Sequence, residues 1–172
     1  MKKSGFTLIE LIIAVSIIAL IVSVFLANYP GSEPQSQLIN ATSALMRDLR
    51  LAQTKDATNI NYGSSPVSGW GISLADDKLS YYLFADVNGD SVYNTSTESI
   101  VSKGGREITL PVGVIASSND LDNSIIFYHD QDILKTDILD EDPVFSVTLI
   151  ETSTGASKHV YVNNYGLIYS DL

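Results

Sequence analysis

Hydrophobic and polar positions divide this chain into three stretches with different patterns. From Phe6 to about Leu26 the residues are almost all apolar, which predicts one helix of about 21 residues. At about 1.5 Å per residue such a helix is roughly 30 Å long, which is the thickness of a bilayer core. Glu10 is the one charged residue within this run. An ionisable group in hydrocarbon costs about 2.5–3.5 kcal/mol on insertion scales, so Glu10 requires a partner or a role.

The second stretch has the period of an amphipathic helix. Pro30 should end the first helix, and Ser32 is suited to cap the next one, which we expect over 32–58. Its apolar positions recur at intervals of three and four residues and should pack on a sheet; they are Leu38, Ala41, Leu45, Leu49 and Ala52. Its charged side chains are expected to face elsewhere; they are Arg47, Asp48, Arg50 and Lys55.

Beyond Asn59 the pattern changes to short strands, and we expect a β-rich domain over 59–172. Runs of β-branched and aromatic residues are separated by clusters of Gly, Ser, Asn and Asp. Asp76-Asp77 and Thr154-Gly155 are typical of hairpin turns. The candidate strands are Trp70–Leu74, Leu79–Phe84, Glu107–Leu110, Ser124–Tyr128, Val144–Ile150, Lys158–Val162 and Leu167–Tyr169. A long N-terminal helix packed on an antiparallel sheet is an α+β fold.

Composition narrows the classes of function. The chain has 172 residues and a net charge of −10, and the lysines at positions 2 and 3 lie outside the expected soluble part. Such an acidic domain is not expected to bind nucleic acid. There is no cysteine, and hence no disulfide or thiol chemistry. His129 and His159 lie beside no nucleophile motif, so we expect surface or edge residues and no enzyme activity. Trp70 and the tyrosines are expected in the core and at its rim.

The residues before and within the apolar run form a specific motif. The sequence Gly5-Phe6-Thr7-Leu8-Ile9-Glu10, preceded by two lysines, closely resembles the class III signal of type IV pilin-like proteins. The resemblance implies that a membrane prepilin peptidase removes residues 1–5 by cutting between Gly5 and Phe6, and that Phe6 is then N-methylated. It also implies that Glu10 neutralises the Phe6 ammonium of a neighbouring subunit during filament assembly. Because the cut precedes the apolar run, a transmembrane helix over 6–28 is retained, with its short N-terminus on the cytoplasmic side.

Three weaker matches extend the resemblance along the chain. They resemble the H-type minor pseudopilins and related minor pilins (the GspH/FimT-like group), and they are Leu49–Gln53, Gly69–Ile72 and Val160–Ile168. The implied fold is pilin-like, and the implied function is that of a minor pilin or pseudopilin in a type IV pilus or type II secretion filament. Its partners would be other subunits of the filament. It would be a single-pass protein of the cytoplasmic (inner) membrane with an extracytoplasmic β domain. The alternative is an anchored extracytoplasmic binding module that does not polymerise.

A run of oxygen-bearing residues after the second candidate strand suggests a cation site. Its first residues follow the spacing of an EF-hand loop, in which alternating oxygens converge on Ca²⁺. Ser91 replaces the usual Gly, the final Glu arrives one residue late, and a strand precedes the loop, so a true EF-hand is not expected. Two interpretations remain: a calcium loop of another kind, or a solvated Asx-rich turn. The candidate ligands are Asp86, Asn88, Asp90, the Val92 carbonyl, Asn94 and Glu98.

A second acidic run follows, and its spacing is irregular. We expect it to be an exposed loop and not a metal site; its residues are Asp130, Asp132, Asp137, Asp140, Glu141 and Asp142. No cofactor is required by any motif, and Ca²⁺ is the one ligand that the sequence suggests.

Overall fold

The structure is a computed structural model of the chain. It describes residues 5–27, 33–58, 66–94, 96, 98, 105–119, 123–128, 145–163 and 165–171. The chain forms two compact units, Met1–Glu33 and Pro34–Leu172. The expected N-cap at Ser32, the turn at Pro30, His129 and the second acidic run all lie outside the described residues.

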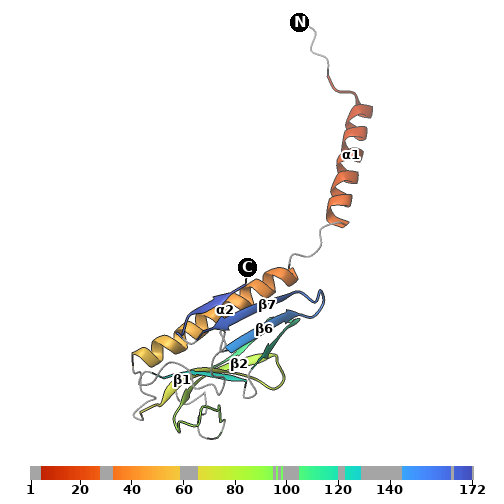
Figure 1. The fold of residues 1–172 in the computed structure, drawn as a ribbon. Coiled ribbons are helices and arrows are strands. Elements are labelled where there is room, and N and C mark those ends of the chain that lie inside the picture. The colour runs from red at the N-terminus through yellow and green to blue at the C-terminus, as the bar shows by residue number, and fades with distance from the viewer. Residues whose placement is uncertain are drawn as a thin grey trace. The chain divides into compact units, whose positions relative to one another are not determined.

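The first unit contains one helix, α1 (Leu8–Ala27), which corresponds to the apolar run (Figure 1). The sequence predicted a helix over 6–28, and the helix begins at Leu8. Its large apolar side chains are 48–77% exposed, because none of them has a core to enter within this unit. Over Leu8–Leu26 the helix is long and apolar enough to cross a membrane.

Helix α2 (Glu33–Ala57) belongs to the second unit from Pro34 onward and covers the core of the β domain. The predicted apolar stripe is buried, with Leu45, Leu49 and Ala52 at 0% exposure. Figure 1 shows α2 lying along the side of the domain that carries β6 and β7. This long helix on antiparallel strands confirms the predicted α+β fold.

The strands form two four-stranded antiparallel sheets where the sequence suggested one. The first sheet has the order β3-β2-β1-β5 and the second β4-β6-β7-β8. The bounds of the first sheet are β1 (Gly69–Leu74), β2 (Ser80–Asp86), β3 (Arg106–Thr109) and β5 (Ser124–Phe127). The bounds of the second are β4 (Val114–Ser118), β6 (Phe145–Glu151), β7 (Ser157–Val162) and β8 (Ile168–Ser170). Both predicted hairpin turns join adjacent strands, β1 to β2 and β6 to β7.

Two details of the strands differ from the prediction. Strand β4 was not predicted, because its apolar run is only three residues long and is followed by two serines; its pairing with β6 defines it. Strand β2 was expected to end at Phe84 but continues to Asp86, whose partner on β1 is Gly69. Asp86 is therefore held by the ladder of a sheet and is not a free loop residue.

The Gly-Trp-Gly sequence of β1 is explained by close contact with β5. Trp70 is 1% exposed and lies in the core, as predicted. The glycines on either side of it point to the opposite face, where Ile126 of β5 lies against them. A Cβ atom at Gly71 would collide with the backbone carbonyl of Ile125, so only glycine fits there.

The prediction for Asp48 was wrong, since its side chain is fully buried. The carboxylate accepts hydrogen bonds from the Tyr81 hydroxyl at 2.9 Å and from Arg106 Nη2 at 2.9 and 3.0 Å. Arg47 Nε also donates to it, at 3.1 Å. Position 48 lies three residues after Leu45 and four before Ala52, which places it on the buried face. The position of Asp48 in the helical period, and not its charge, therefore decides which way its side chain faces.

Arg106→Met is expected to destabilise the β domain by about 1–3 kcal/mol, because it removes two charge-assisted hydrogen bonds from a buried carboxylate. Arg47→Met is the matched control, since Arg47 is 67% exposed and Asp48 keeps its other two partners without it. We expect this control to cost less than about 1 kcal/mol. Thermal unfolding of the full chain in detergent, followed by near-UV circular dichroism, measures both. Equal losses for the two variants would contradict this role of Arg106.

Candidate functional site

The N-terminal motif places three residues ahead of α1. Gly5, Phe6 and Thr7 are described and are not helical, and Phe6 is 86% exposed. No atom lies within 4 Å of the position that a Cβ on Gly5 would occupy. The chain itself therefore imposes no steric requirement for glycine at this position, and any such requirement must come from a molecule that binds here.

Glu10 is hydrogen-bonded to the residue that caps its own helix. Thr7 donates to Glu10 Oε2 from its backbone N–H at 3.2 Å and from its hydroxyl at 3.1 Å. The backbone N–H of Glu10 donates back to Thr7 Oγ1 at 3.3 Å. This reciprocal arrangement is a capping box, and it satisfies donors that the first turn of a helix leaves unpaired. The capping role of Thr7 was not predicted, although the Thr-x-x-Glu spacing at the start of an apolar run is the recognised signal.

The acidic loop begins at the end of β2 with Asp86, which is fully buried. Its Oδ1 accepts from the Gly89 N–H at 2.6 Å. Its Oδ2 accepts from the Ser91 N–H at 3.2 Å and from the Tyr128 hydroxyl at 3.0 Å. Gly89 and Ser91 both have positive φ, 75° and 68°, and this curvature folds the loop back over Asp86. Burial, the largest effect, raises the pKa of Tyr128 to about 12, and the Asp86 charge adds to it.

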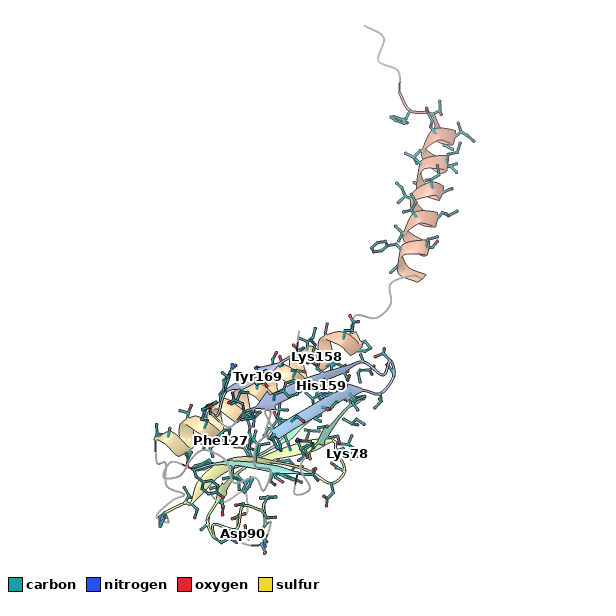
Figure 2. All side chains as sticks on the ribbon, in the orientation of Figure 1. Lys78, Asp90, Phe127, Lys158, His159 and Tyr169 are labelled. Atoms are coloured by element: carbon teal, nitrogen blue, oxygen red, sulfur yellow. The ribbon has the colours of Figure 1, made fainter. Side chains whose placement is uncertain are left out.

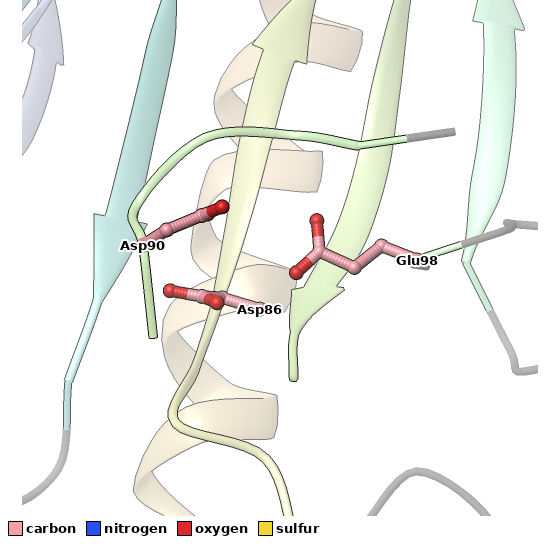
Figure 3. Close-up of side chains that lie close together, drawn as sticks. All are labelled: Asp86, Asp90 and Glu98. Carbon is pink, nitrogen blue, oxygen red and sulfur yellow. The ribbon is translucent and has the colours of Figure 1, made fainter. Parts of the chain in front are cut away.

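Glu98 closes the loop from its far end and is 1% exposed. Its two carboxylate oxygens accept the backbone N–H groups of Val87 and Asn94, each at 3.0 Å. Burial raises the pKa of Glu98, and the charges of Asp86 and Asp90 raise it further, against the lowering effect of those two hydrogen bonds. Asp86, Asp90 and Glu98 each bring a carboxylate oxygen within 4.8 Å of the others (Figure 3). Two buried carboxylates and one exposed one therefore converge at this point.

Two of the other predicted ligands, Asn88 and Asn94, form hydrogen bonds within the loop. Asn88 donates to Asp90 Oδ2 at 2.7 Å, while its own side-chain oxygen accepts the Asp90 N–H at 3.2 Å. The side-chain oxygen of Asn94 accepts from the backbone and hydroxyl of Ser96. These contacts are those of Asx turns. Of the six predicted ligands, the structure thus brings together the three carboxylates.

The same loop covers the outer face of the first sheet. The Tyr93 ring stacks on Tyr82 at a centroid distance of 4.9 Å and lies 5.1 Å from Phe84. Tyr82 and Phe84 belong to β2, the strand that ends in Asp86. The carboxylate cluster therefore ties down a loop that shields aromatic residues of the sheet from water.

One histidine lies in the described part of the chain, His159 of β7. Its Nδ1 lies 2.9 Å from Thr148 Oγ1, within hydrogen-bond distance, and its ring stacks on Tyr161. It is partly exposed near Asp171, as expected of a surface histidine.

Two comparisons with known proteins agree with this arrangement. Residues 1–26 match the family model of the prokaryotic N-terminal methylation motif. A crystal structure of the type IV minor pilin FimU of Pseudomonas aeruginosa is similar to the chain, with a TM-score of 0.54 at 13% sequence identity. The similarity covers 83% of this chain and 93% of that one. The chain therefore carries a prokaryotic N-terminal methylation motif on a pilin-like α+β fold.

Proposed function

We propose that this chain is a processed, membrane-anchored subunit of a type IV pilus or type II secretion filament, acting as a minor pilin or pseudopilin. The observation that carries the proposal is the methylation motif directly joined to an apolar helix with a single carboxylate. A chain used only as an anchor has no need of Glu10, whose charge opposes insertion into hydrocarbon. The pilin-like fold and the similarity to a minor pilin support the same proposal.

Assembly is the mechanism by which such a subunit acts. A prepilin peptidase cuts after Gly5, the new N-terminus at Phe6 is methylated, and α1 anchors the subunit in the cytoplasmic membrane. The apolar side chains of α1 are then available to the helices of neighbouring subunits in the filament. The capping box holds the Glu10 carboxylate at the N-terminal end of α1, close in sequence to the Phe6 ammonium. The carboxylate is thus held at the end of the helix where a neighbour's ammonium is to be neutralised.

Mass spectrometry of the mature chain tests this proposal. A chain that begins at methylated Phe6 and is present in the sheared filament fraction supports it. A chain that keeps Met1, or that never enters the filament fraction, would instead support the alternative of an anchored binding module that does not polymerise.

We also propose that the loop of Asp86, Asp90 and Glu98 binds Ca²⁺ and thereby stabilises the β domain. The convergence of three carboxylates within 4.8 Å supports this, since Ca²⁺ prefers several oxygen ligands. The raised pKa of Glu98 supports it too. Burial and the charges of Asp86 and Asp90 destabilise the ionised form of Glu98, and a bound cation would stabilise that form. Three carboxylates suggest a modest affinity, in the roughly 10⁻⁴–10⁻³ M range of extracellular modules.

Millimolar Ca²⁺ is expected to raise the melting temperature of the full chain in detergent. Binding to the folded state alone stabilises it by about 2.7 kcal/mol at a hundredfold excess over Kd. Mg²⁺ should have a much smaller effect because it gives up its water ligands reluctantly. The double variant Asp86→Asn, Asp90→Asn should lose the Ca²⁺ response.

The matched control for the metal prediction is Asp76→Asn, Asp77→Asn, which removes two carboxylates from the β1–β2 turn outside the cluster. This control should keep the full Ca²⁺ response. A response of equal size in the parent and both double variants would show that the loop is only an Asx-rich turn.

A further inference from the structure

A pocket opens on the outer face of the first sheet, beside the turn that joins β1 to β2. Its volume is about 460 Å³, which is within the range of small-ligand sites. In Figure 2 the turn is marked by Lys78, and the acidic loop, which contributes a wall of the pocket, is marked by Asp90. The side chains of the lining that bear on its chemistry are Ser73, Asp76, Asp77, Tyr82 and Tyr93.

The alternation of side chains along β1 and β2 explains the base of the pocket. Ile72 and Leu74 of β1 point into the core, so Ser73 between them points to the outer face. Tyr82 of β2 is the partner of Ser73 in the ladder and lies on the same face. The Tyr93 ring of the acidic loop stacks on Tyr82 at 4.9 Å. The pocket therefore combines a serine at its base with aromatic rings at its side.

Ser73 is buried, yet its hydroxyl lacks a partner. The residue is 6% exposed, and its side chain forms no hydrogen bond with any residue that the structure describes. Buried hydroxyl groups are normally hydrogen-bonded, because an unpaired one has lost its contacts with water. Since Ser73 lines the pocket, a polar atom of a ligand there would supply the missing bond.

The rim of the pocket is negatively charged. Asp76 and Asp77 line it from the turn, and both are exposed. One oxygen of Asp77 accepts the Leu79 N–H at 2.8 Å, which holds this carboxylate in place. Lys78 follows in sequence but does not line the pocket, and no basic residue is found among the described residues that do. The rim should therefore attract a cation.

Negative charge also surrounds the aromatic side of the pocket. Burial, the largest effect, raises the pKa of Tyr93, and the charges of Glu107 and Glu98 add to this increase. A cation against the Tyr93 ring would be attracted by these charges and by the electron-rich face of the ring. Both the rim and the side of the pocket are thus suited to a positively charged ligand.

The lining favours a guanidinium over other cations. Asp76 and Asp77 belong to no group of three metal-ligating side chains in the described part of the chain, and Ca²⁺ requires several oxygen ligands. An ammonium is a compact and strongly hydrated charge. A guanidinium is planar and weakly hydrated, so it can lie against an aromatic ring while its N–H groups reach carboxylates and a hydroxyl.

We propose that this pocket binds an arginine side chain presented by a peptide segment of a partner protein. The rings of Tyr82 and Tyr93 contact the guanidinium, Asp76 and Asp77 neutralise it, and Ser73 accepts one of its N–H groups. Free arginine is a poorer ligand, because its own carboxylate is repelled by the two carboxylates of the rim. This inference goes beyond the proposed function, since the pocket can bind such a segment whether or not the chain enters a filament.

Titration with capped tripeptides tests the proposal. The probe is acetyl-Gly-Arg-Gly-amide, added to the full ¹⁵N-labelled chain in detergent at a constant Ca²⁺ concentration, and binding is followed by NMR shifts. The control peptide carries citrulline, which has nearly the shape of arginine but no charge. We expect a Kd of about 1 mM for the arginine peptide and at least about tenfold weaker binding of the citrulline peptide and of free arginine. The affinity for the arginine peptide should also fall as salt is added.

Substitutions locate the binding in the pocket. Asp76→Asn with Asp77→Asn keeps the shape of the turn and should weaken binding of the arginine peptide by at least about tenfold. Glu33→Gln with Asp171→Asn removes the same charge from exposed positions that do not line the pocket, and it should leave binding unchanged. Ser73→Ala should weaken binding by about threefold. Its melting temperature should stay close to the parent's, because its hydroxyl loses no partner within the described residues.

The outcomes separate this inference from the proposed function. Equal binding of the arginine and citrulline peptides, or equal binding by the parent and the Asp76, Asp77 double variant, would overturn the proposal. So would the absence of shifts at about 10 mM peptide. Free arginine that binds as well as the peptide would overturn the assignment to a peptide segment. None of these results depends on processing or filament assembly, so the two proposals stand or fall separately.

Discussion

Gly5→Leu is expected to leave the chain at its full precursor length, with no detectable mature form. A peptidase must bring the backbone before the scissile bond close to its catalytic groups, and a leucine side chain obstructs that approach. The chain itself has free space at this position, so the substitution should not disturb α1 or the β domain. Immunoblotting of membrane fractions distinguishes precursor from mature chain, and mass spectrometry identifies the N-terminus.

A graded series makes the processing prediction sharper. Gly5→Ala adds one methyl group and should reduce processing less than Gly5→Leu does. Unfolding of the β domain should be the same in all three proteins. Normal amounts of a chain that begins at Phe6 in the leucine variant would show that Gly5 does not direct cleavage.

Glu10→Ala is expected to keep processing and membrane insertion and to abolish most incorporation into filaments. Insertion should become easier, by at most about 2.5–3.5 kcal/mol, because the substitution removes a charge whose cost is greatest at the centre of the bilayer. Assembly should fail because no carboxylate remains to neutralise the Phe6 ammonium of a neighbour. The measurement is the fraction of processed chain that is recovered in sheared filaments. A subunit at the filament tip, which has no neighbour above it, would show a smaller loss.

Two control variants separate charge from helix capping. Glu10→Gln keeps a side-chain oxygen that can accept the Thr7 hydrogen bonds but has no charge, so it should fail as Glu10→Ala does. Ser16→Ala removes a hydroxyl that donates to the Ile12 carbonyl of its own helix, and it should assemble normally. If Glu10→Gln assembles as well as the parent, the carboxylate serves the capping box and not a neighbour's N-terminus.

Much of the fold was predictable from the sequence because its signals are local. The period of α2, the apolar length of α1 and the alternation in β6 each follow from neighbouring residues. The period of α2 also places Asp48 on the buried face, but the partners that allow a carboxylate to stay there, Tyr81 and Arg106, are far away in sequence and were not predictable. Strand β4 was not predictable either, because its pairing with β6 defines it.

The same distinction between local signals and long-range contacts applies to the candidate sites. The sequence by itself determined the N-terminal motif, the position of Glu10 and the run of acidic residues after β2, because each is a pattern of adjacent residues. Only the tertiary structure decided that the Glu98 carboxylate lies close to that of Asp86. It also decided that the side-chain oxygens of Asn88 and Asn94 accept hydrogen bonds from residues of the same loop. It likewise decided that residues of β1, β2 and the acidic loop line one pocket. The physical reason is that burial, convergence and exposure depend on contacts between residues far apart in the chain, which no local pattern encodes.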